Sequence, residues 1–156
     1  MKKLALYLET SIIGFLFAEE IEEKKSVTRK LFQEIKDKKF DAYISDLVLK
    51  ELDFTKDEKK RKEMKKIVED FHVLKTTEQC NNLGLQYIKN KAIAQGAVSD
   101  AIHVAVATFY NLDIIVSWNL RHIVKVRTKM EVNSINMRNN YKSIEIATPE
   151  EVVEND

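Results

Sequence analysis

The sequence has very few residues that cross-link or interrupt a chain. Of its 156 residues, one is cysteine (Cys80), one is proline (Pro149) and three are glycine. A single cysteine excludes a disulfide bond within the chain and is typical of a reducing compartment. No Cys/His spacing indicates a structural zinc site. The scarcity of proline and glycine predicts many helices joined by short connections.

Long apolar runs are missing as well, and their absence excludes a membrane-spanning helix. The first residues, MKKLALYLE, resemble the start of a signal peptide, but their apolar part is short and no small-residue cleavage site follows it. We therefore interpret them as a first strand and expect a cytoplasmic protein. A chain of this length can bury a sizeable core, so we expect a single domain over residues 1–156.

Neither sign of charge dominates the sequence. The formal net charge is +1, which gives no global attraction to nucleic acid. Between residues 50 and 66, however, eight basic side chains accompany five acidic ones. Such a mixed run is typical of a solvated helix face. The alternative interpretation is a rim beside a site that contacts phosphate groups without sequence specificity.

The sequence does contain an alternation of short apolar runs with helical patterns. Five runs predict strands, at residues 4–8, 42–45, 72–74, 114–117 and 144–147. Most are continuous aliphatic runs, as in strands buried on both faces of a parallel sheet. The residues at helical spacing between them are Val27, Leu31 and Ile35; Met64, Ile67, Val68 and Phe71; Leu83, Tyr87 and Ile88 after a capping Thr77; and Ala101, Ile102, Ala105 and Phe109. This order predicts an α/β fold with a mostly parallel sheet of about five strands between two helical layers.

Four polar residues fall near the carboxyl ends of these strands, where open α/β sheets form their sites. They are Glu9 at the end of the first strand, Glu51 one short helix beyond the second, Asp100 at the start of the helix SDAIHVAVATF, and Asn119 after the fourth strand. In a parallel sheet all four can converge on one edge. Three carboxylates there would repel each other unless a divalent cation neutralised them, and oxygen ligands select Mg²⁺ or Mn²⁺. Such ions suit phosphodiester hydrolysis.

Each of these residues also has an ordinary structural interpretation. Asp100 would stabilise a helix N-terminus by ~0.5 kcal/mol. Glu51 would pair with a basic residue one turn away, and Asn119 would form a turn or cap a helix. Glu9 is harder to explain in this way, because a carboxylate at the end of a buried strand loses its hydration unless it is paired or coordinated. The residues alone therefore allow an acidic metal site without requiring one.

Four motifs in sequence order resemble the PIN-domain family, and within it the VapC-like toxins of toxin–antitoxin pairs. LYLETSIIG is similar to the family's first strand, apolar residues followed by Asp-Thr-Ser, and SDLVLKEL to its second segment, where Glu51 matches the second acid. SDAIHVAVA resembles the third motif, with Asp100 as the third acid. IIVSWNLRHI and the closing ATPEEVV resemble the end of one subgroup. The similarity covers nearly the whole chain.

The resemblance implies a PIN-like three-layer fold and a metal-dependent endoribonuclease that forms a homodimer and is blocked by a small antitoxin. The residues that it assigns to the site are Glu9, Glu51 and Asp100 as ligands of Mg²⁺ or Mn²⁺, Asn119 as a fourth catalytic residue, and Thr10, Ser11, Ser117 and His103 around them. Thr10 and Ser11 would hold the first acid or a metal-bound water. Ser117 and Asn119 would complete the far side of the pocket.

Two positions differ from the usual family pattern. The first acid is Glu9 where relatives have Asp, and an amide, Asn119, stands where a fourth acid is common. Because Mg²⁺ demands near-ideal ligand geometry, the alternative hypothesis is a PIN scaffold with weak or no catalysis that binds RNA or a protein. A receiver-like phosphoacceptor domain ranks lower, because residues 72–77 offer no aspartate to phosphorylate.

Two further residues near these motifs have more than one interpretation. His103 follows Asp100 by three residues and could act as a general base; we favour a residue that packs or hydrogen-bonds near the site. Trp118 precedes Asn119 and could stack on a base. Aromatic residues at strand ends more often belong to the core, and we expect Trp118 to be buried there.

Overall fold

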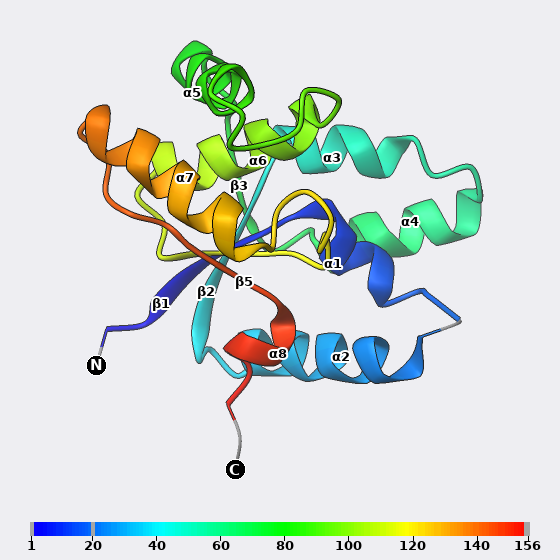
Figure 1. Cartoon of the computed structure of the whole chain (residues 1–156). Helices are drawn as coiled ribbons and strands as arrows, with labels where there is room; N and C mark the ends of the chain where they lie inside the picture. The colour runs from blue at the N-terminus through cyan, green and yellow to red at the C-terminus, as the bar shows by residue number, and fades with distance from the viewer. Residues whose placement is uncertain (1, 20, 155–156) are drawn as a thin grey trace.

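A computed structural model of the chain describes residues 2–19 and 21–154. In this part of the chain, five strands form one sheet in the order β3-β2-β1-β4-β5, and every neighbouring pair is parallel (Figure 1). The strands are β1 Leu4–Leu8, β2 Phe40–Ser45, β3 His72–Leu74, β4 Ile114–Val116 and β5 Glu145–Ala147. The predicted α/β fold with a central parallel sheet is confirmed.

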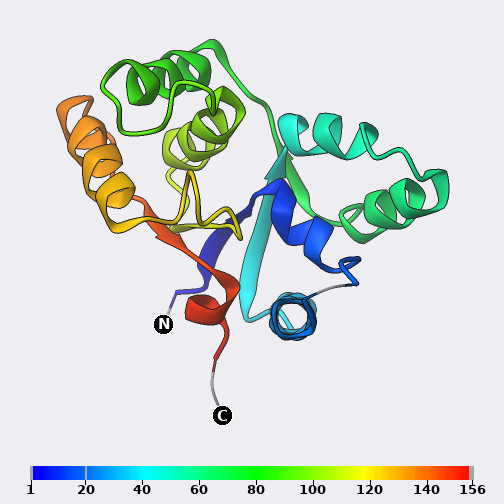
Figure 2. The ribbon, with the colours of Figure 1, turned by 45° about the vertical axis from the view of Figure 1, so that its right-hand side comes forward.

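Helices cover both faces of this sheet. In the described ranges they are α1 Thr10–Phe15, α2 Glu22–Lys36, α3 Asp46–Asp53, α4 Glu58–Ile67, α5 Glu78–Lys89, α6 Val98–Phe109, α7 Val126–Arg138 and α8 Pro149–Val152. Figure 2 shows α5, α6 and α7 on one side of the sheet and α1, α2 and α4 on the other. The strand order explains the two layers. The chain first moves outward from β1 to β3 and then returns past β1 to β4, and because crossovers between parallel strands are right-handed, the two directions place their helices on opposite faces of the sheet. None of the helices in the described ranges has the length and apolar character needed to cross a membrane.

Burial in the sheet is greatest at its centre. The last three residues of β1 and the last two of β4 have no exposed surface. Both strands have paired neighbours on either side and helices on either face, which explains their continuous aliphatic runs. The edge strand β3 instead leaves His72 and Val73 exposed. The apolar pattern was therefore clearest where burial is complete.

Three strand boundaries differ by one or two residues from the sequence prediction. β2 begins at Phe40 because it pairs along β1 from that residue, opposite Leu4. β4 ends at Val116, one residue earlier than predicted. β5 begins after Ile144, because the side chain of Asn133 binds the N–H and the carbonyl of that residue, at 2.8 and 2.9 Å. Local apolar runs do not reveal such pairing partners.

One helical pattern extended too far along the chain, and another was located correctly. α4 ends at Ile67, whereas the predicted pattern continued to Phe71. Phe71 lies in the turn before β3, where its ring stacks on that of Phe32 with centroids 5.9 Å apart. The predicted cap of α5 is confirmed, since the Thr77 hydroxyl accepts a hydrogen bond from the N–H of Cys80.

The carboxyl end of β1 lies where the strand order reverses. One side of β1 leads to β2 and β3 and the other to β4 and β5. In open α/β sheets, this switch point is where ligands bind. The N–H of Glu9 donates to the carbonyl of Val116 at 3.1 Å and so joins the ends of β1 and β4. The segments α1, α3 and the loop after β4 each follow the carboxyl end of a parallel strand, so they lie at the same edge of the sheet (Figure 1).

Candidate active site

Glu9 is buried at the switch point but does not lack partners. Only 6% of its surface is exposed. Its carboxylate accepts hydrogen bonds from the Ser11 hydroxyl at 2.5 Å, the Ser11 N–H at 3.2 Å and the Ser117 hydroxyl at 2.6 Å. Because Glu9 precedes α1, its side chain also caps that helix. These donors replace the water that the carboxylate loses on burial.

Glu51 reaches the same edge of the sheet from α3. Its Oε1 accepts from Thr10 Oγ1 at 2.6 Å and from His103 Nε2 at 2.5 Å, and its Oε2 accepts from Ser99 Oγ at 2.8 Å. Burial alone would raise the pKa of this carboxyl, but the hydrogen bonds from His103, Thr10 and Ser99 lower the pKa to about 2. Glu51 is therefore ionised at neutral pH. Thr10 holds the second acid, whereas its neighbour Ser11 holds the first.

Asp100 is the third residue of α6 and lies near Glu9. Burial raises the pKa of Asp100, and the charge of Glu9 raises it further. His103, His122 and the side chain of Asn119 oppose this effect. The surroundings of Asp100 thus disfavour its ionised form. Carboxyl groups with such a raised pKa are common at functional sites.

Ser117 and Asn119 follow β4 and contact the acids of the site. Ser117 Oγ donates to Glu9 and accepts from the N–H of Asn119 at 2.9 Å. The side-chain oxygen of Asn119 accepts from the N–H of His122 at 2.9 Å, so it stabilises the turn after the strand. Asn119 therefore combines the turn-forming role with a place beside Asp100.

Trp118 points away from the site and into the core, as expected. It is 6% exposed, and its ring nitrogen donates to Thr28 Oγ1 at 2.9 Å. Its ring packs against Phe15 with centroids 5.6 Å apart. In this position the ring has no face free to stack on a nucleotide base.

Three residues of the site were missed by sequence reasoning: Tyr7, Ser45 and Ser99, the last of which donates to Glu51. Tyr7 and Ser45 are fully buried, and a hydrogen bond of 2.8 Å joins their hydroxyls. Tyr7 Oη also lies 2.5 Å from Nδ1 of His103. The available signal was a hydroxyl in each of two predicted strands, Tyr7 in the first and Ser45 at the end of the second. Nothing in the local pattern indicates that these hydroxyls meet a histidine far along the chain.

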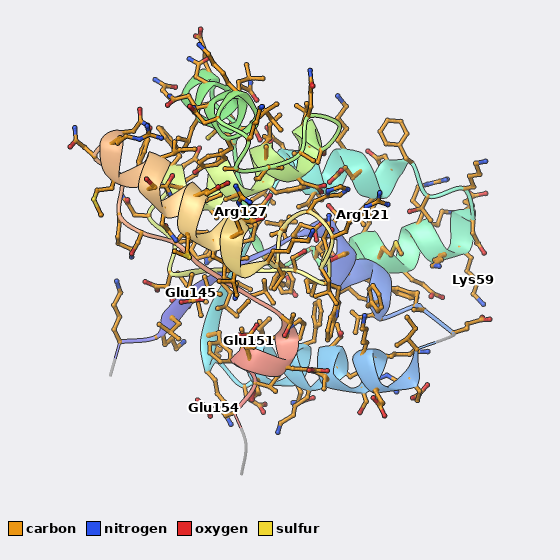
Figure 3. All side chains as sticks on the ribbon, in the orientation of Figure 1. Lys59, Arg121, Arg127, Glu145, Glu151 and Glu154 are labelled. Atoms are coloured by element: carbon orange, nitrogen blue, oxygen red, sulfur yellow. The ribbon has the colours of Figure 1, made fainter. Side chains whose placement is uncertain are left out.

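Several charged side chains are labelled in Figure 3. Arg121 lies on the loop between β4 and α7, the same loop that carries Asn119, and Arg127 lies on α7. Glu145 belongs to β5, Glu151 to α8, and Glu154 follows α8.

The basic run at residues 50–66 falls on α3, α4 and their connection. Lys62 pairs with Glu58 one helical turn away, and Lys65 pairs with Asp53. Lys59 lies at the outer end of α4 in Figure 3. Pairing with neighbouring acids favours the interpretation of a solvated helix face.

Three solved structures share this arrangement of strands and helices. VapBC2 from Rickettsia felis, bound to a fragment of promoter DNA, matches with a TM-score of 0.60 and 13% identity over 93% of this chain and 98% of its own. VapC20 of Mycobacterium tuberculosis, a toxin that cleaves the sarcin–ricin loop, gives 0.56 and 14% over 70% and 86%. A toxin–antitoxin complex from Klebsiella pneumoniae gives 0.57 and 16% over 80% and 93%. The chain has a VapC-like fold. No protein-family model and no curated protein sequence matches it.

The VapC-like fold brings the three predicted acids to one edge without forming a complete ligand set. Among the described residues, no group of three or more His, Cys, Asp or Glu side chains is placed to hold a metal ion. The donor chemistry nevertheless fits Mg²⁺, which keeps several waters and binds through one or two carboxylates together with substrate phosphates. Glu9 and Asp100 suit this mode, because a cation would relieve their repulsion. The full ligand set stays a prediction.

Proposed function

We propose that the protein is a Mg²⁺- or Mn²⁺-dependent endoribonuclease that hydrolyses RNA phosphodiester bonds in the cytoplasm. The observation that supports this proposal is that Glu9, at the end of β1, lies near Asp100 of α6, while Glu51 of α3 is bonded to Thr10 directly after Glu9, in a VapC-like fold. VapC20, which shares the fold, cleaves the sarcin–ricin loop, and this supports RNA as the substrate class. A bound divalent cation supplies an activated water and neutralises charge on the scissile phosphate.

Each acid has a distinct part in this proposal. Glu9 and Asp100 hold the cation, with Ser11 and Ser117 fixing the carboxylate of Glu9. Glu51 accepts hydrogen bonds from three donors and serves as a further ligand of the cation or orients the attacking water. Because Glu51 stays ionised at neutral pH, it can accept a hydrogen bond from that water and so orient it.

A cleavage assay with isosteric variants tests the proposal. The parent protein is incubated with RNA and Mg²⁺ or Mn²⁺, and in parallel with a chelator. Asp100→Asn and Glu51→Gln should lose cleavage while keeping the circular dichroism spectrum of the parent. Glu145→Gln, which changes an exposed acid of β5, should cut like the parent. If Asp100→Asn and Glu51→Gln cut equally well, the acidic edge is not the active site.

We further propose a small antitoxin that blocks this site, and a homodimer of the toxin. A toxin–antitoxin complex is among the structures with this fold, which supports such a partner. A short open reading frame beside the gene would be the candidate for this partner. Co-expression should yield a complex that does not cleave RNA. Light scattering of the protein alone should give twice the mass of 18.2 kDa.

A second candidate function is a scaffold that binds RNA or a protein with little or no catalysis. The absence of a three-ligand group among the described residues favours it, as does the longer first acid. Under this hypothesis, Glu9→Asp or Asn119→Asp should increase metal binding or cleavage. No cleavage by the parent with any divalent cation, together with retained RNA binding, would establish the second candidate.

A further inference from the structure

A chain of buried hydrogen bonds leaves α3 at its N-terminus and returns to the same helix at Glu51. The N–H of Val48 donates to Ser45 Oγ at 3.3 Å, and Ser45 Oγ lies 2.8 Å from Tyr7 Oη. From Tyr7 Oη it is 2.5 Å to His103 Nδ1, and from His103 Nε2 it is 2.5 Å to Glu51 Oε1. Ser45 and Tyr7 have no exposed surface, and His103 is 1% exposed. Water therefore does not supply alternative partners along this path.

With a neutral His103, the ionised Glu51 sets the direction of every bond. Glu51 can only accept, so His103 donates from Nε2 and its Nδ1 accepts; Ser45 Oγ, which accepts from Val48, then donates its own proton to the oxygen of Tyr7. The Tyr7 proton then goes to Nδ1 of His103. That leaves the proton of the imidazole on Nε2, where it is donated to the Glu51 carboxylate. In this direction every donor and acceptor along the path is satisfied.

This path from Val48 through Ser45, Tyr7 and His103 to Glu51, called the circuit below, connects the three elements that carry or precede the acids of the site. Tyr7 is two residues before Glu9 in the chain, and His103 is three residues after Asp100 on α6. Ser45 caps the helix that carries Glu51. A shift of any one of these elements would break a buried hydrogen bond, which costs far more than breaking one in water.

The circuit also decides which oxygen of Glu51 is open. Oε1 accepts from Thr10 and His103 and has no free lone pair, whereas Oε2 accepts only from Ser99. The Glu51 side chain is 30% exposed, so this second oxygen can meet a ligand. We propose that Tyr7 and His103 are positioning residues whose hydrogen bonds hold Glu51 in one orientation and leave Oε2 as its single working oxygen. The consequence for cleavage rests on the proposed function; the circuit itself does not.

The direction of the circuit can be tested without any activity. The protein has three histidines, and ¹⁵N spectra distinguish a ring nitrogen that carries a proton from one that does not. A His103→Gln spectrum identifies the signals of His103. We expect its Nε2 to be protonated and slow to exchange, and its Nδ1 to be bare. A proton on Nδ1 of His103 would overturn the inference.

The positioning role is tested with two pairs of variants. Tyr7→Phe removes the central hydroxyl of the circuit. Tyr87→Phe removes an equally buried hydroxyl on α5 that bonds Asn136 at 2.5 Å, away from the site. His103→Gln keeps an N–H that reaches toward Glu51, whereas His103→Leu has none. Mn²⁺ affinity by calorimetry, RNA cleavage and unfolding by urea are measured for each.

We expect Tyr7→Phe and His103→Leu to lose about 10–100-fold in Mn²⁺ affinity or in cleavage, as is usual for residues that orient metal ligands. Tyr87→Phe should lose stability alone, and His103→Gln should recover part of what His103→Leu loses. Equal losses in the two tyrosine variants, or none from Tyr7→Phe, would show a purely structural role. If the parent does not cleave RNA, the spectra and the Mn²⁺ affinities still decide on the circuit, and only the proposed function fails.

Discussion

Ser117 donates a 2.6 Å hydrogen bond to Glu9 and thereby joins the carboxyl end of β4 to that of β1. The same hydroxyl accepts from the N–H of Asn119, the first residue of the turn that follows. Ser117 has no exposed surface and Glu9 is 6% exposed, so bulk water has little access to this bond when Ser117 is lost. One hydroxyl thus compensates the burial of the first acid and shapes the loop beside the site.

Replacing Ser117 by alanine should lower the free energy of unfolding by about 1.5–3 kcal/mol, because it removes a hydrogen bond to a charged group and leaves a buried N–H without a partner. Urea unfolding measures this as a lower midpoint with an unchanged slope. Ser134→Ala, on the exposed side of α7, is the matched control and should shift stability by less than about 0.5 kcal/mol. A loss no larger than that of the control would mean that Glu9 does not depend on Ser117.

Replacing Asp100 by asparagine should stabilise the metal-free protein. Burial and the charge of Glu9 raise the pKa of Asp100, so its ionised form destabilises the fold at every pH above that raised pKa. Removing the charge should add about 0.5–2 kcal/mol of stability at pH 7. The loss of the favourable helix-dipole term, ~0.5 kcal/mol, reduces this gain without reversing it.

Thermal unfolding in a chelator measures this effect, and a rise of roughly 2–4 °C per kcal/mol is expected for a chain of this size. Adding Mn²⁺ should then raise the Tm of the parent and leave that of Asp100→Asn unchanged, because only the parent binds the ion. A lower Tm for the variant in the chelator would contradict the repulsion between Asp100 and Glu9.

The sequence predicted the parallel sheet and, from it, the edge at which Glu9 and Glu51 lie. Parallel strands place the residues after β1 and β2 at the same edge, whereas the position of Asp100 at the start of α6 depends on how that helix packs. The burial of Trp118 was also predictable from its place at a strand end. Fold and acidic edge follow from the apolar pattern because complete burial makes that pattern strong.

The hydrogen-bond partners of the acids could not be predicted in the same way. Tyr7 and His103 are 96 residues apart, and no local pattern indicates that they touch. Thr10 was expected beside the first acid, yet it donates to Glu51 because α1 turns its first residue toward α3. Such pairings depend on how the helices pack against one another, and the spacing of apolar residues does not specify that packing.

The stability of the protein should depend on the charge of Glu51 at low pH. Its pKa of about 2 in the folded protein lies below the ordinary value of 4.5. The stabilisation from this group is therefore complete above about pH 4.5 and is lost as the pH falls toward 2. Glu51→Gln has no such group. Its free energy of unfolding should fall less steeply than that of the parent over this interval, and parallel curves for the two proteins would refute the prediction.

Removing Arg121 should weaken RNA binding more than removing Lys59. Arg121 lies on the loop that also carries Asn119 and His122, whereas Lys59 is at the outer end of α4 (Figure 3). Each change to alanine removes one positive charge. If phosphates of the substrate cross the loop after β4, Arg121→Ala should raise KM roughly three- to tenfold, equivalent to about 0.7–1.4 kcal/mol. It should leave kcat unchanged if the contact is equally strong in the ground state and the transition state. It should also reduce the salt dependence of binding by about 0.7 in the logarithmic slope, as expected for one contact to a single strand.

Lys59→Ala, the control, should change neither KM nor the salt dependence. Equal effects of the two substitutions would instead place the RNA along α4, and the basic run at residues 50–66 would then be its binding rim.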